Sequence, residues 1–498
     1  MEKLSRKNLY AFAAGGLGQN MVYMLFANNL LNFILFTKNL NDKQFVALTA
    51  IFFGCRLWDG FIDPFLGSKI DGTNSKLGKY KPWLIGGTLG VSVTLLLLFL
   101  LPIDGWSFII FMAIAYILFS TTYSMDDTAY WSMVPGLSQR QDERNLIIAR
   151  ASIFCGIGQQ LVGMLLPVFT AGEQSIGGNA VAGYQFFCAL SVALMIVFRL
   201  ITIFGVKESK AAVAQPAKKV TLREMWRVLK SNDQLIWNLL VLFGQNVVSG
   251  VSTNTLFNLF IYMAFGYQGT LVLLISVAGG ALVIGFTLFM ASILKKFKRK
   301  TLVTFAFYAF LGGSAAIILS GMFAPTGALL TLGGAEISLR FLGIAFGTLF
   351  TNFGSNILYQ IPVLHLADCV EYGEWKTGGR HEGIIFSMRS FVVQCASAIN
   401  QLIVSAILLL LGIKTFSDNI SAIEQEVYRG GITEEAKTLQ IQQLIAAVPK
   451  EKSVSLLIAM FALSSFVFFL GYVVYRKKFF LDEAKYEKIL TELNAPKI

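Results

Sequence analysis

The sequence predicts an all-α polytopic membrane protein, with about twelve transmembrane helices in two pseudo-symmetric bundles of six. Three observations lead to this fold class. The chain has 498 residues, of which 55% are hydrophobic and 14% are charged. Apolar stretches of about 20 residues, the length that a helix needs to cross the hydrocarbon core, recur along the whole chain. Basic residues gather in every second loop between these stretches.

We expect six spans before a polar segment at residues 206–234 and six spans after it. A soluble fold is excluded because the apolar stretches have no polar stripe that would face water. We therefore divide the chain into an N-terminal bundle (1–205), a cytoplasmic linker (206–234), a C-terminal bundle (235–476) and a cytoplasmic tail (477–498). The expected spans are 8–37, 44–67, 82–102, 106–135, 147–170, 183–205, 235–265, 269–294, 301–323, 337–366, 383–412 and 454–475.

The first span follows a short basic segment, and no small-residue cleavage site comes after it, so we expect it to stay as a membrane anchor. The loops after spans two, four, six and eight carry most of the basic residues. By the positive-inside rule, both termini and the linker then lie in the cytoplasm. The net charge of +12 is a topology signal and does not indicate nucleic-acid binding. The chain is expected to be a multi-pass protein of the cell membrane and a monomer.

The second span contains the run Arg56-Leu-Trp-Asp59-Gly-Phe-Ile-Asp63-Pro64. A charge in hydrocarbon costs about 2.5–3.5 kcal/mol even on mild scales, so intramembrane charges usually mark an ion, proton or substrate path. Asp59 and Asp63 share one helix face, and Arg56 lies on that face one turn earlier. The alternative is an internal salt bridge that only holds helices together.

The fourth span carries Tyr123, Asp127 and Trp131 at a spacing of four, so they share one helix face. A carboxylate accepts hydrogen bonds from sugar hydroxyls, and an indole ring packs on the apolar C–H face of a sugar. Ordinary core aromatics are the alternative for Tyr123 and Trp131. Arg150, at the start of span five, would bridge Asp127 and a ligand hydroxyl, or else serve as an interfacial arginine.

The linker contains a capping-box pattern, Thr221-Leu-Arg-Glu224, which opens a short amphipathic helix ending near Lys230. This helix either lies on the membrane surface, with its basic residues on lipid phosphates, or packs on the spans. The two halves also carry a faint repeat, because Gly18-Gln19-Asn20 recurs as Gly244-Gln245-Asn246 in span seven. Six plus six spans with a parallel repeat is the layout of major-facilitator transporters, whose site lies at mid-membrane between the halves.

Span eleven holds Arg389 and Gln394, and the arginine requires an anionic partner, for which Asp59, Asp63 and Asp127 are candidates. The preceding segment has alternating charges, including Glu371, Glu374 and Arg380. We interpret this segment as a cytoplasmic gate, with simple loop solvation as the alternative.

Five cysteines in or near spans and two histidines indicate neither a disulfide framework nor a metal-centred enzyme, and we expect no cofactor.

Three segments share a recognisable pattern. Residues 56–83 read R-x-W-D-x-x-x-D-P-x-x-G and then D-x-T-x-S-x-x-G-K-x-K-P-W, residues 123–135 read Y-x-x-x-D-x-x-x-W-S-x-V-P, and residues 371–383 read E-Y-G-E-W-K-T-G-G-R-x-E-G. Together they resemble the glycoside–pentoside–hexuronide:cation symporter family, the melibiose-permease group of the major facilitator superfamily. The resemblance implies a bacterial inner membrane.

The resemblance also implies roles for particular residues. Asp59 and Asp63 occupy the positions of the cation-site carboxylates, so sodium at these two residues is one expectation. Tyr123, Asp127, Trp131 and Arg150 occupy sugar-site positions. Loop 68–81 and segment 371–383 would belong to the cytoplasmic gate.

The chain departs from melibiose-type members at three places. It has Gln19-Asn20 instead of Lys-Asp, Ile62 instead of an asparagine between the two aspartates, and Gln394 instead of a lysine. Asn20 still offers hydrogen bonds to a sugar. Ile62 removes an oxygen that sodium would use, whereas a proton needs only a carboxylate whose pKa rises on burial. We therefore expect coupling to H⁺ ahead of Na⁺.

The function predicted from the sequence is import of a glycoside or oligosaccharide, coupled to a cation and working by alternating access. The alternatives are an uncoupled sugar facilitator or exchanger, a transporter-like sensor or lipid carrier, and a membrane-embedded glycosyl-transfer enzyme. The enzyme is disfavoured because the longest loop, 413–452, has no plausible catalytic cluster, and no P-loop exists to use ATP. Whether the sugar is neutral or a uronate stays open, because Arg389 offers a partner for a uronate carboxylate.

Overall fold

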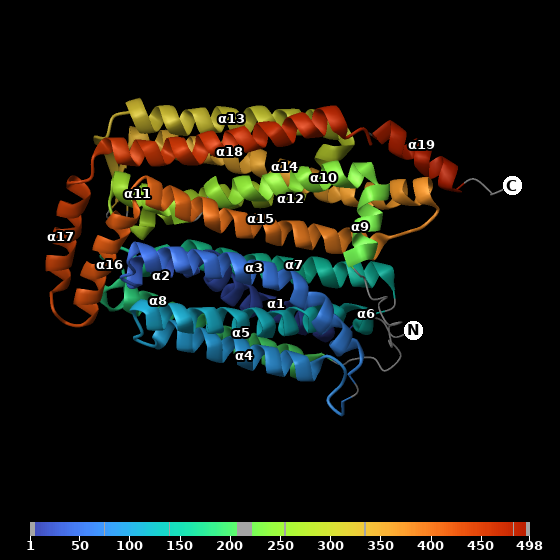
Figure 1. Ribbon diagram of the computed structural model, residues 1–498, viewed down its shortest axis with the longest axis horizontal. Helices are drawn as coiled ribbons and strands as arrows, with labels where there is room; N and C mark the ends of the chain where they lie inside the picture. The colour runs from blue at the N-terminus through green and yellow to red at the C-terminus, as the bar shows by residue number, and fades with distance from the viewer. Residues whose placement is uncertain are drawn as a thin grey trace. The chain divides into compact units, whose positions relative to one another are not determined.

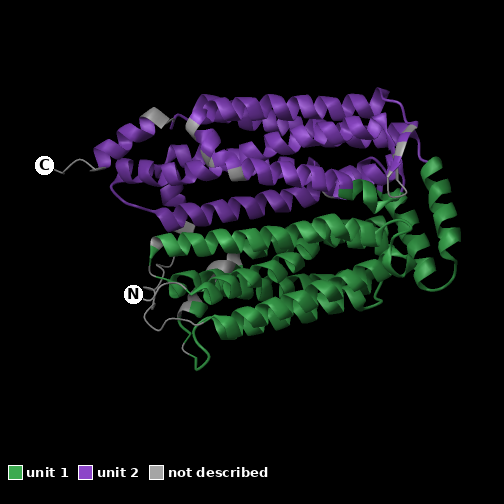
Figure 2. Ribbon diagram, turned by 180° about the vertical axis from the view of Figure 1, so that it is seen from behind, with its two compact units in different colours: residues 1–219, 267–273, 414–447 green, residues 220–266, 274–413, 448–498 purple. Residues whose placement is uncertain are grey.

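Nearly all of the chain is helical in a computed structural model, which describes residues 5–73, 75–138, 140–206, 222–252, 255–332, 335–481 and 483–494. The side chain of Asp63 lies outside the described part, as does Thr221 of the expected capping box. Two compact units are present (Figure 2). Unit 1 comprises residues 1–219, 267–273 and 414–447, and unit 2 comprises residues 220–266, 274–413 and 448–498.

Unit 1 is built from long helices joined by short turns (Figure 1). Its elements are α1 (Arg6–Tyr23), the π-helical turn η1 (Met24–Asn28), α2 (Asn29–Thr37), α3 (Asp42–Asp71), α4 (Lys81–Leu100), α5 (Gly105–Ser132), α6 (Val134–Leu137), α7 (Gln141–Thr170), the 3₁₀ turn η2 (Ile176–Gly178), α8 (Ala180–Gly205), α16 (Lys414–Tyr428) and α17 (Glu434–Ala446).

Unit 2 is also built mainly from long helices, and its described residues include a short antiparallel β-hairpin. Its elements are α9 (Leu222–Ser231), α10 (Asp233–Ser252), α11 (Thr255–Phe265), most of α12 (Gly269–Lys296), α13 (Arg299–Phe323), β1 (Ala328–Leu332), β2 (Ala335–Ser338), α14 (Leu339–Thr377), α15 (Glu382–Leu410), α18 (Lys450–Lys478) and α19 (Glu483–Asn494). Residues 269–273 of α12 belong to unit 1.

Eleven of the described helical segments are long and apolar enough to cross a membrane. They fall on eleven of the twelve expected spans, which confirms the all-helical membrane fold. The remaining expected span, 44–67, corresponds to α3, a helix of 30 residues with Arg56 and Asp59 near its centre. A capping box formed by Asn41 and Gln44 starts α3, and both side chains bond the opposite backbone N–H.

The repeated Gly-Gln-Asn motif makes similar contacts in the two units. In Gly18–Asn20 and again in Gly244–Asn246, the asparagine amide donates to the carbonyl four residues earlier, at 2.9 and 2.8 Å. The glutamine amide reaches a later helix of its own unit. It donates to Asp127 of α5 at 2.8 Å in unit 1 and to Ser355 of α14 at 2.7 Å in unit 2. The internal repeat predicted from the sequence therefore has a structural counterpart, with a carboxylate on the unit 1 side only.

Small residues bring α1 against its neighbours in unit 1. A Cβ atom on Gly158 of α7 would lie 2.2 Å from the Leu17 carbonyl oxygen, and one on Gly16 would lie 2.6 Å from Cys155 Sγ. One on Gly18 would lie 2.5 Å from the Met195 Cα atom of α8. Such close backbone approach is how glycine-bearing helices pack in a membrane. It fixes which faces of α1 and α7 meet.

The segment between α15 and α18 forms a helical hairpin, α16–α17, that packs on unit 1 (Figure 2). Fully buried Glu424 accepts from the Ala180 N–H at 2.7 Å, and buried Lys437 donates to the Gly178 carbonyl at 2.5 Å. Gln425 donates to the Thr37 carbonyl at 2.7 Å. In unit 1 the hairpin lies at the end of the bundle opposite the N-terminus (Figure 1).

The linker helix α9 packs on unit 2. Val228 is buried in the core of that unit, together with residues of α10, α13 and α14. Trp226 is 59% exposed, with the Lys230 ammonium 5.3 Å from its ring centre. Of the two interpretations of this helix, packing on the spans thus holds for one face, and the other face stays open to solvent or lipid.

Candidate functional site

Asp127 is the centre of a polar group inside unit 1. It lies on α5, and its Oδ1 accepts from the Gln19 amide of α1 at 2.8 Å and from the Trp131 indole N–H at 3.1 Å. The predicted spacing of four therefore brings Asp127 and Trp131 into contact. Gln19 is 1% exposed, and its Oε1 has no hydrogen-bond partner among the described residues.

Asn20 lies beside this group and faces α7. Its Oδ1 accepts from the Gln159 amide at 2.8 Å, while its own amide bonds the backbone of α1. The sequence analysis did not single out Gln159. The signal that would have found it is the pairing of α1 with α7, because Gly158 next to it makes the close contact.

The aromatic residues of α5 pack in two directions. The Tyr123 ring lies 5.2 Å from the Tyr23 ring and 5.7 Å from the Phe119 ring, centre to centre. The Trp131 ring packs edge-on against Tyr130 at 5.2 Å. Both therefore have core contacts, as the alternative interpretation expected, and Trp131 also orients the carboxylate of the site.

Arg150 does not join this group in the structure. Its side chain is exposed on α7, and the contacts of Asp127 described above come from Gln19 and Trp131. Nine residues separate it from Gln159, which at about 100° per residue puts the two on opposite faces of the helix. The bridging role that we expected for Arg150 between Asp127 and a ligand hydroxyl stays a prediction.

Asp126, the neighbour of Asp127, points to another part of unit 1. It is fully buried and forms an ion pair with Arg199 of α8, which is also fully buried. Thr88 of α4 donates to the same carboxylate at 3.1 Å. The guanidinium also stacks on the Tyr130 ring at 4.5 Å. This cluster ties α4, α5 and α8 together and leaves Asp127 as the carboxylate of the polar group.

Asp59 forms the second polar group of unit 1. Ser120 of α5 donates its hydroxyl to Asp59 Oδ1, and the Arg56 guanidinium lies 3.8 Å from Oδ2. Arg56 is buried and donates to the Ala27 carbonyl at 3.0 Å, within the π-helical turn η1. π-Turns of this kind are frequent at functional sites. The ion pair of the alternative interpretation is thus present, and the cation role of Asp59 stays a prediction.

Ile62 is buried on the same helix, so an apolar side chain stands where melibiose-type members have an amide. Ser120 contributes a hydroxyl oxygen beside the carboxylate of Asp59. Within the described residues, no group of three or more His, Cys, Asp and Glu side chains forms a metal cage.

In unit 2, Arg389 of α15 donates to the Tyr359 hydroxyl of α14 at 2.7 Å, and its Nε is buried without a partner among the described residues. The carboxylates expected to pair with it belong to unit 1, so that pairing stays a prediction. Gln394 is half-buried on α15.

The expected gate segment is bonded within unit 2. Glu371 accepts from the Tyr486 hydroxyl of α19, and Arg380 pairs with Glu374 at 3.1 Å and with Glu382 at 3.5 Å. The hydrogen bond that Arg380 donates to Glu374 raises the pKa of its guanidinium. Lys376 pairs with Asp233 of α10 at 2.6 Å.

A buried polar cluster that sequence reasoning missed joins three helices of unit 2. His365 Nδ1 lies 2.7 Å from Asp368 Oδ2, and His365 Nε2 lies 2.9 Å from the Tyr475 hydroxyl. Arg299 of α13 pairs with the same carboxylate. Spacings of i and i+3 on α14 would have suggested the His365–Asp368 contact.

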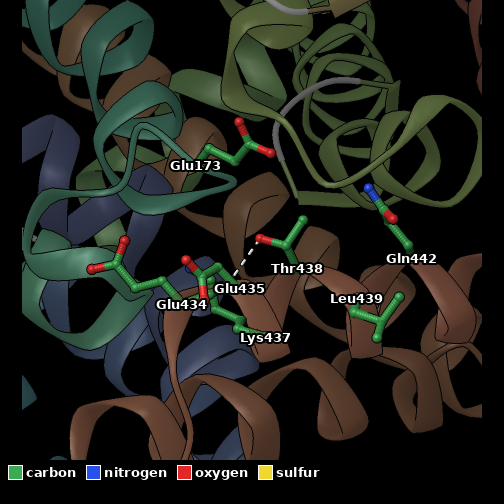
Figure 3. Close-up of a pocket in the computed structure, with 7 residues that line it drawn as sticks. All are labelled: Glu173, Glu434, Glu435, Lys437, Thr438, Leu439 and Gln442. Atoms are coloured by element: carbon green, nitrogen blue, oxygen red, sulfur yellow. Dashed lines mark hydrogen bonds between the residues drawn. The ribbon is translucent and has the colours of Figure 1, made fainter.

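A surface cavity of about 360 Å³ lies against α17, away from the residues above (Figure 3). Three carboxylates line it, from Glu173, Glu434 and Glu435, and the Thr438 hydroxyl bonds the Glu434 carbonyl at 3.1 Å. It shares no residue with the groups around Asp127 and Asp59.

Comparisons with known proteins identify the family. A family model described as MFS/sugar transport protein matches residues 11–474. A lactose permease of Lactobacillus delbrueckii subsp. bulgaricus is 28% identical over 97% of this chain and 72% of its own length. A raffinose carrier protein of Pediococcus pentosaceus is 28% identical over 97% of this chain and 70% of its own length. A lactose permease of Leuconostoc lactis is 28% identical, with 82% of this chain and 64% of its own length covered.

Two solved structures support the fold alone. A D-xylose–proton symporter aligns with a TM-score of 0.59 at 13% identity, covering 91% of this chain and 99% of that chain. A bacterial homolog to the human lysosomal transporter Spinster aligns with a TM-score of 0.58 at 10% identity, covering 95% of this chain and 96% of that chain.

The family model and these relatives show that the protein is a membrane transporter and not an enzyme. The chain belongs to the MFS/sugar transport protein family, and the resemblance to the glycoside–pentoside–hexuronide:cation symporters is confirmed.

Proposed function

We propose that this protein is a secondary active sugar transporter that imports a glycoside or oligosaccharide together with a cation by alternating access. The observation that carries the proposal is the pair of polar groups in unit 1. Asp127 with Gln19 and Trp131 has the chemistry of a sugar site, and Asp59 with Arg56 and Ser120 has the chemistry of a coupling site. The relatives that carry lactose and raffinose support the substrate class.

The sugar part rests on complementary surfaces. An indole ring packs on the apolar face of a pyranose, and the carboxylate beside it accepts hydrogen bonds from hydroxyls. A hydrogen bond joins Trp131 and Asp127, so the ring and the carboxylate lie side by side and can contact the same sugar. Asn20 and Tyr123 complete the set that we assign to substrate.

The coupling part favours a proton over sodium. Asp59 has a guanidinium 3.8 Å away and buried Ile62, an apolar residue, on its helix. Sodium would compete with that guanidinium for the carboxylate, whereas a proton binds the carboxylate directly and releases the ion pair. The positive-inside pattern supports an inner-membrane protein with both termini in the cytoplasm.

Replacing Asp59 by Asn tests the coupling role. Asp59→Asn keeps the size and the Ser120 contact but cannot exchange a proton, so gradient-driven uptake should fall to the level of equilibration while sugar counterflow persists. Both are measured in proteoliposomes, and counterflow also serves as the control that the variant is folded. Continued uphill accumulation would disprove the coupling role. Loss of both activities would favour a purely structural ion pair.

A further inference from the structure

A side chain outside the predicted site, Gln159 of α7, contacts Asn20, which we assign to substrate. Its amide donates to Asn20 Oδ1 at 2.8 Å, and Asn20 adjoins Gln19, whose amide bonds Asp127. The Gln159–Asn20 hydrogen bond joins α7 to α1, and the Gln19–Asp127 hydrogen bond joins α1 to α5.

The packing of α7 on α1 fixes the direction of Gln159. Gly158 allows the Leu17 carbonyl to approach so closely that a Cβ would lie 2.2 Å away. Because this register is set by backbone contact, the neighbouring residue has little freedom to rotate away from α1. Arg150 is on the opposite face of the same helix, so the polar group has no arginine from α7.

The side-chain oxygens of Gln159 and Gln19 are hydrogen-bond acceptors that a ligand could use. Gln159 Oε1 accepts no hydrogen bond from another residue in the described ranges, and Gln159 is only half-buried. Gln19 Oε1 is buried and also lacks a partner in that part of the chain. A buried amide oxygen without a partner costs about 1–3 kcal/mol, so a ligand hydroxyl that donates to it would be favoured.

The charges of the group select the class of ligand. Amides offer donors and acceptors without charge, which matches hydroxyls, and Asp127 contributes a negative charge. A uronate carboxylate placed among these side chains would meet the like charge of Asp127, which disfavours it relative to a neutral sugar.

We propose that Gln159 is a further sugar-recognition residue, and that Gln159, Asn20, Gln19 and Asp127 together select uncharged sugars by their hydroxyls. This inference rests on the proposed function, because it assigns a role within the same site. The competing explanation is that Gln159 only holds α7 against α1.

The test is a cycle between protein variants and sugar analogues. Sugar counterflow in proteoliposomes is measured for wild type, Gln159→Ala, Gln159→Asn and the matched control Gln160→Ala, the next residue of α7. The probe is whichever of lactose and raffinose the wild type carries faster, together with its monodeoxy derivatives and a uronic acid derivative of the same sugar.

We expect Gln159→Ala to raise KM about 3- to 10-fold with Vmax within twofold, as for one lost neutral hydrogen bond. On wild type, one monodeoxy derivative should have a KM higher than that of the parent sugar by the same factor. On Gln159→Ala, the KM of this derivative should equal that of the parent sugar. Gln160→Ala should behave as wild type, and the uronic acid should bind wild type at least 10-fold more weakly than the neutral sugar.

Equal losses for the parent sugar and every derivative, or a fall in Vmax alone, would show a packing role and overturn the inference. Equal binding of the uronic acid would overturn the selection of uncharged sugars. If Gln159→Ala does not fold, the same cycle is run on Gln159→Asn, which shortens the amide by one methylene. Absence of counterflow by the wild type with both sugars would instead count against the proposed function itself, and the inference would fall with it.

Discussion

Two adjacent aspartates of α5 have separate roles at the scale of single residues. Asp126 is fully buried against Arg199, and Asp127 lies with Gln19 and Trp131. About 100° of helical rotation separates neighbouring residues, which is enough to direct one carboxylate to the core and the other to the polar group.

Replacing Asp127 by Asn should weaken sugar binding without unfolding the protein. Asp127→Asn keeps an oxygen that can accept from Gln19 and Trp131, but it removes the charge that strengthens hydrogen bonds from hydroxyls. We expect KM for counterflow to rise about 10- to 100-fold, the range for a charge-assisted hydrogen bond. Asp142→Asn, on the exposed start of α7, is the control. An unchanged KM would remove Asp127 from the sugar site.

The sequence predicted part of these residue positions. The spacing of Asp127 and Trp131 is a property of a single helix, so their common face was predicted, and the structure adds the hydrogen bond between them. Gln159 was not, because its contact depends on the register between α1 and α7. Arg150 was expected to bridge Asp127 and a ligand hydroxyl; its side chain is exposed, and its part in the sugar site stays a prediction.

Helix packing at the scale of elements depends on a few glycines. At Gly158 an added Cβ would meet the Leu17 carbonyl oxygen at 2.2 Å, and backbone atoms cannot move aside as side chains do. At Gly156, two residues before Gly158 on the same helix, an added Cβ would meet nothing within 4 Å.

These two glycines form a matched pair of variants. Gly158→Ala should lower the stability of the folded protein by about 1–3 kcal/mol, the usual cost of overpacking, and should also lower sugar affinity because α7 carries Gln159. Gly156→Ala should be neutral or stabilising by about 0.5–1 kcal/mol, since alanine favours the helix. Thermal denaturation in detergent measures both. Similar midpoints for the two variants would contradict the close approach of α1 and α7.

The hairpin α16–α17 is the element that hydropathy did not reveal, because its residues are polar and of mixed charge. Its docking depends on buried polar contacts of Glu424 and Lys437 with main-chain groups near η2. Burial raises the pKa of Glu424 above its usual range, although the Lys437 ammonium 3.7 Å away opposes this shift.

The sign of this shift predicts how stability changes with pH. A carboxyl with a raised pKa in the folded state contributes its full stability below its ordinary pKa of 4.5, and that contribution is lost as the pH rises through the folded pKa. Wild type should therefore lose stability relative to Glu424→Gln as the pH rises above 4.5, by up to about 1.4 kcal/mol per pH unit. Thermal midpoints between pH 4 and 8 measure this, with Glu435→Gln at an exposed position as the control. A difference that does not vary with pH would contradict the account.

The fold of the whole molecule was predictable from hydropathy and loop charge, because spans of fixed length are imposed by the bilayer. The repeat of Gly-Gln-Asn was also visible in the sequence, and the two copies make corresponding contacts in the two units. Tertiary contacts of polar segments were not predictable, such as the docking of the hairpin and the contacts of Tyr475 and Arg299 with the His365–Asp368 pair. They depend on which helices meet, and a single sequence carries no direct record of that.

The central claim, a sugar carrier coupled to a proton through Asp59, is tested most directly by gradient-driven uptake. Purified protein in proteoliposomes is given lactose or raffinose under an imposed proton gradient alone, a sodium gradient alone, or neither. We predict uphill accumulation with the proton gradient only, and none in the Asp59→Asn variant. Accumulation driven by sodium alone, or equal distribution under both gradients with active counterflow, would contradict the claim.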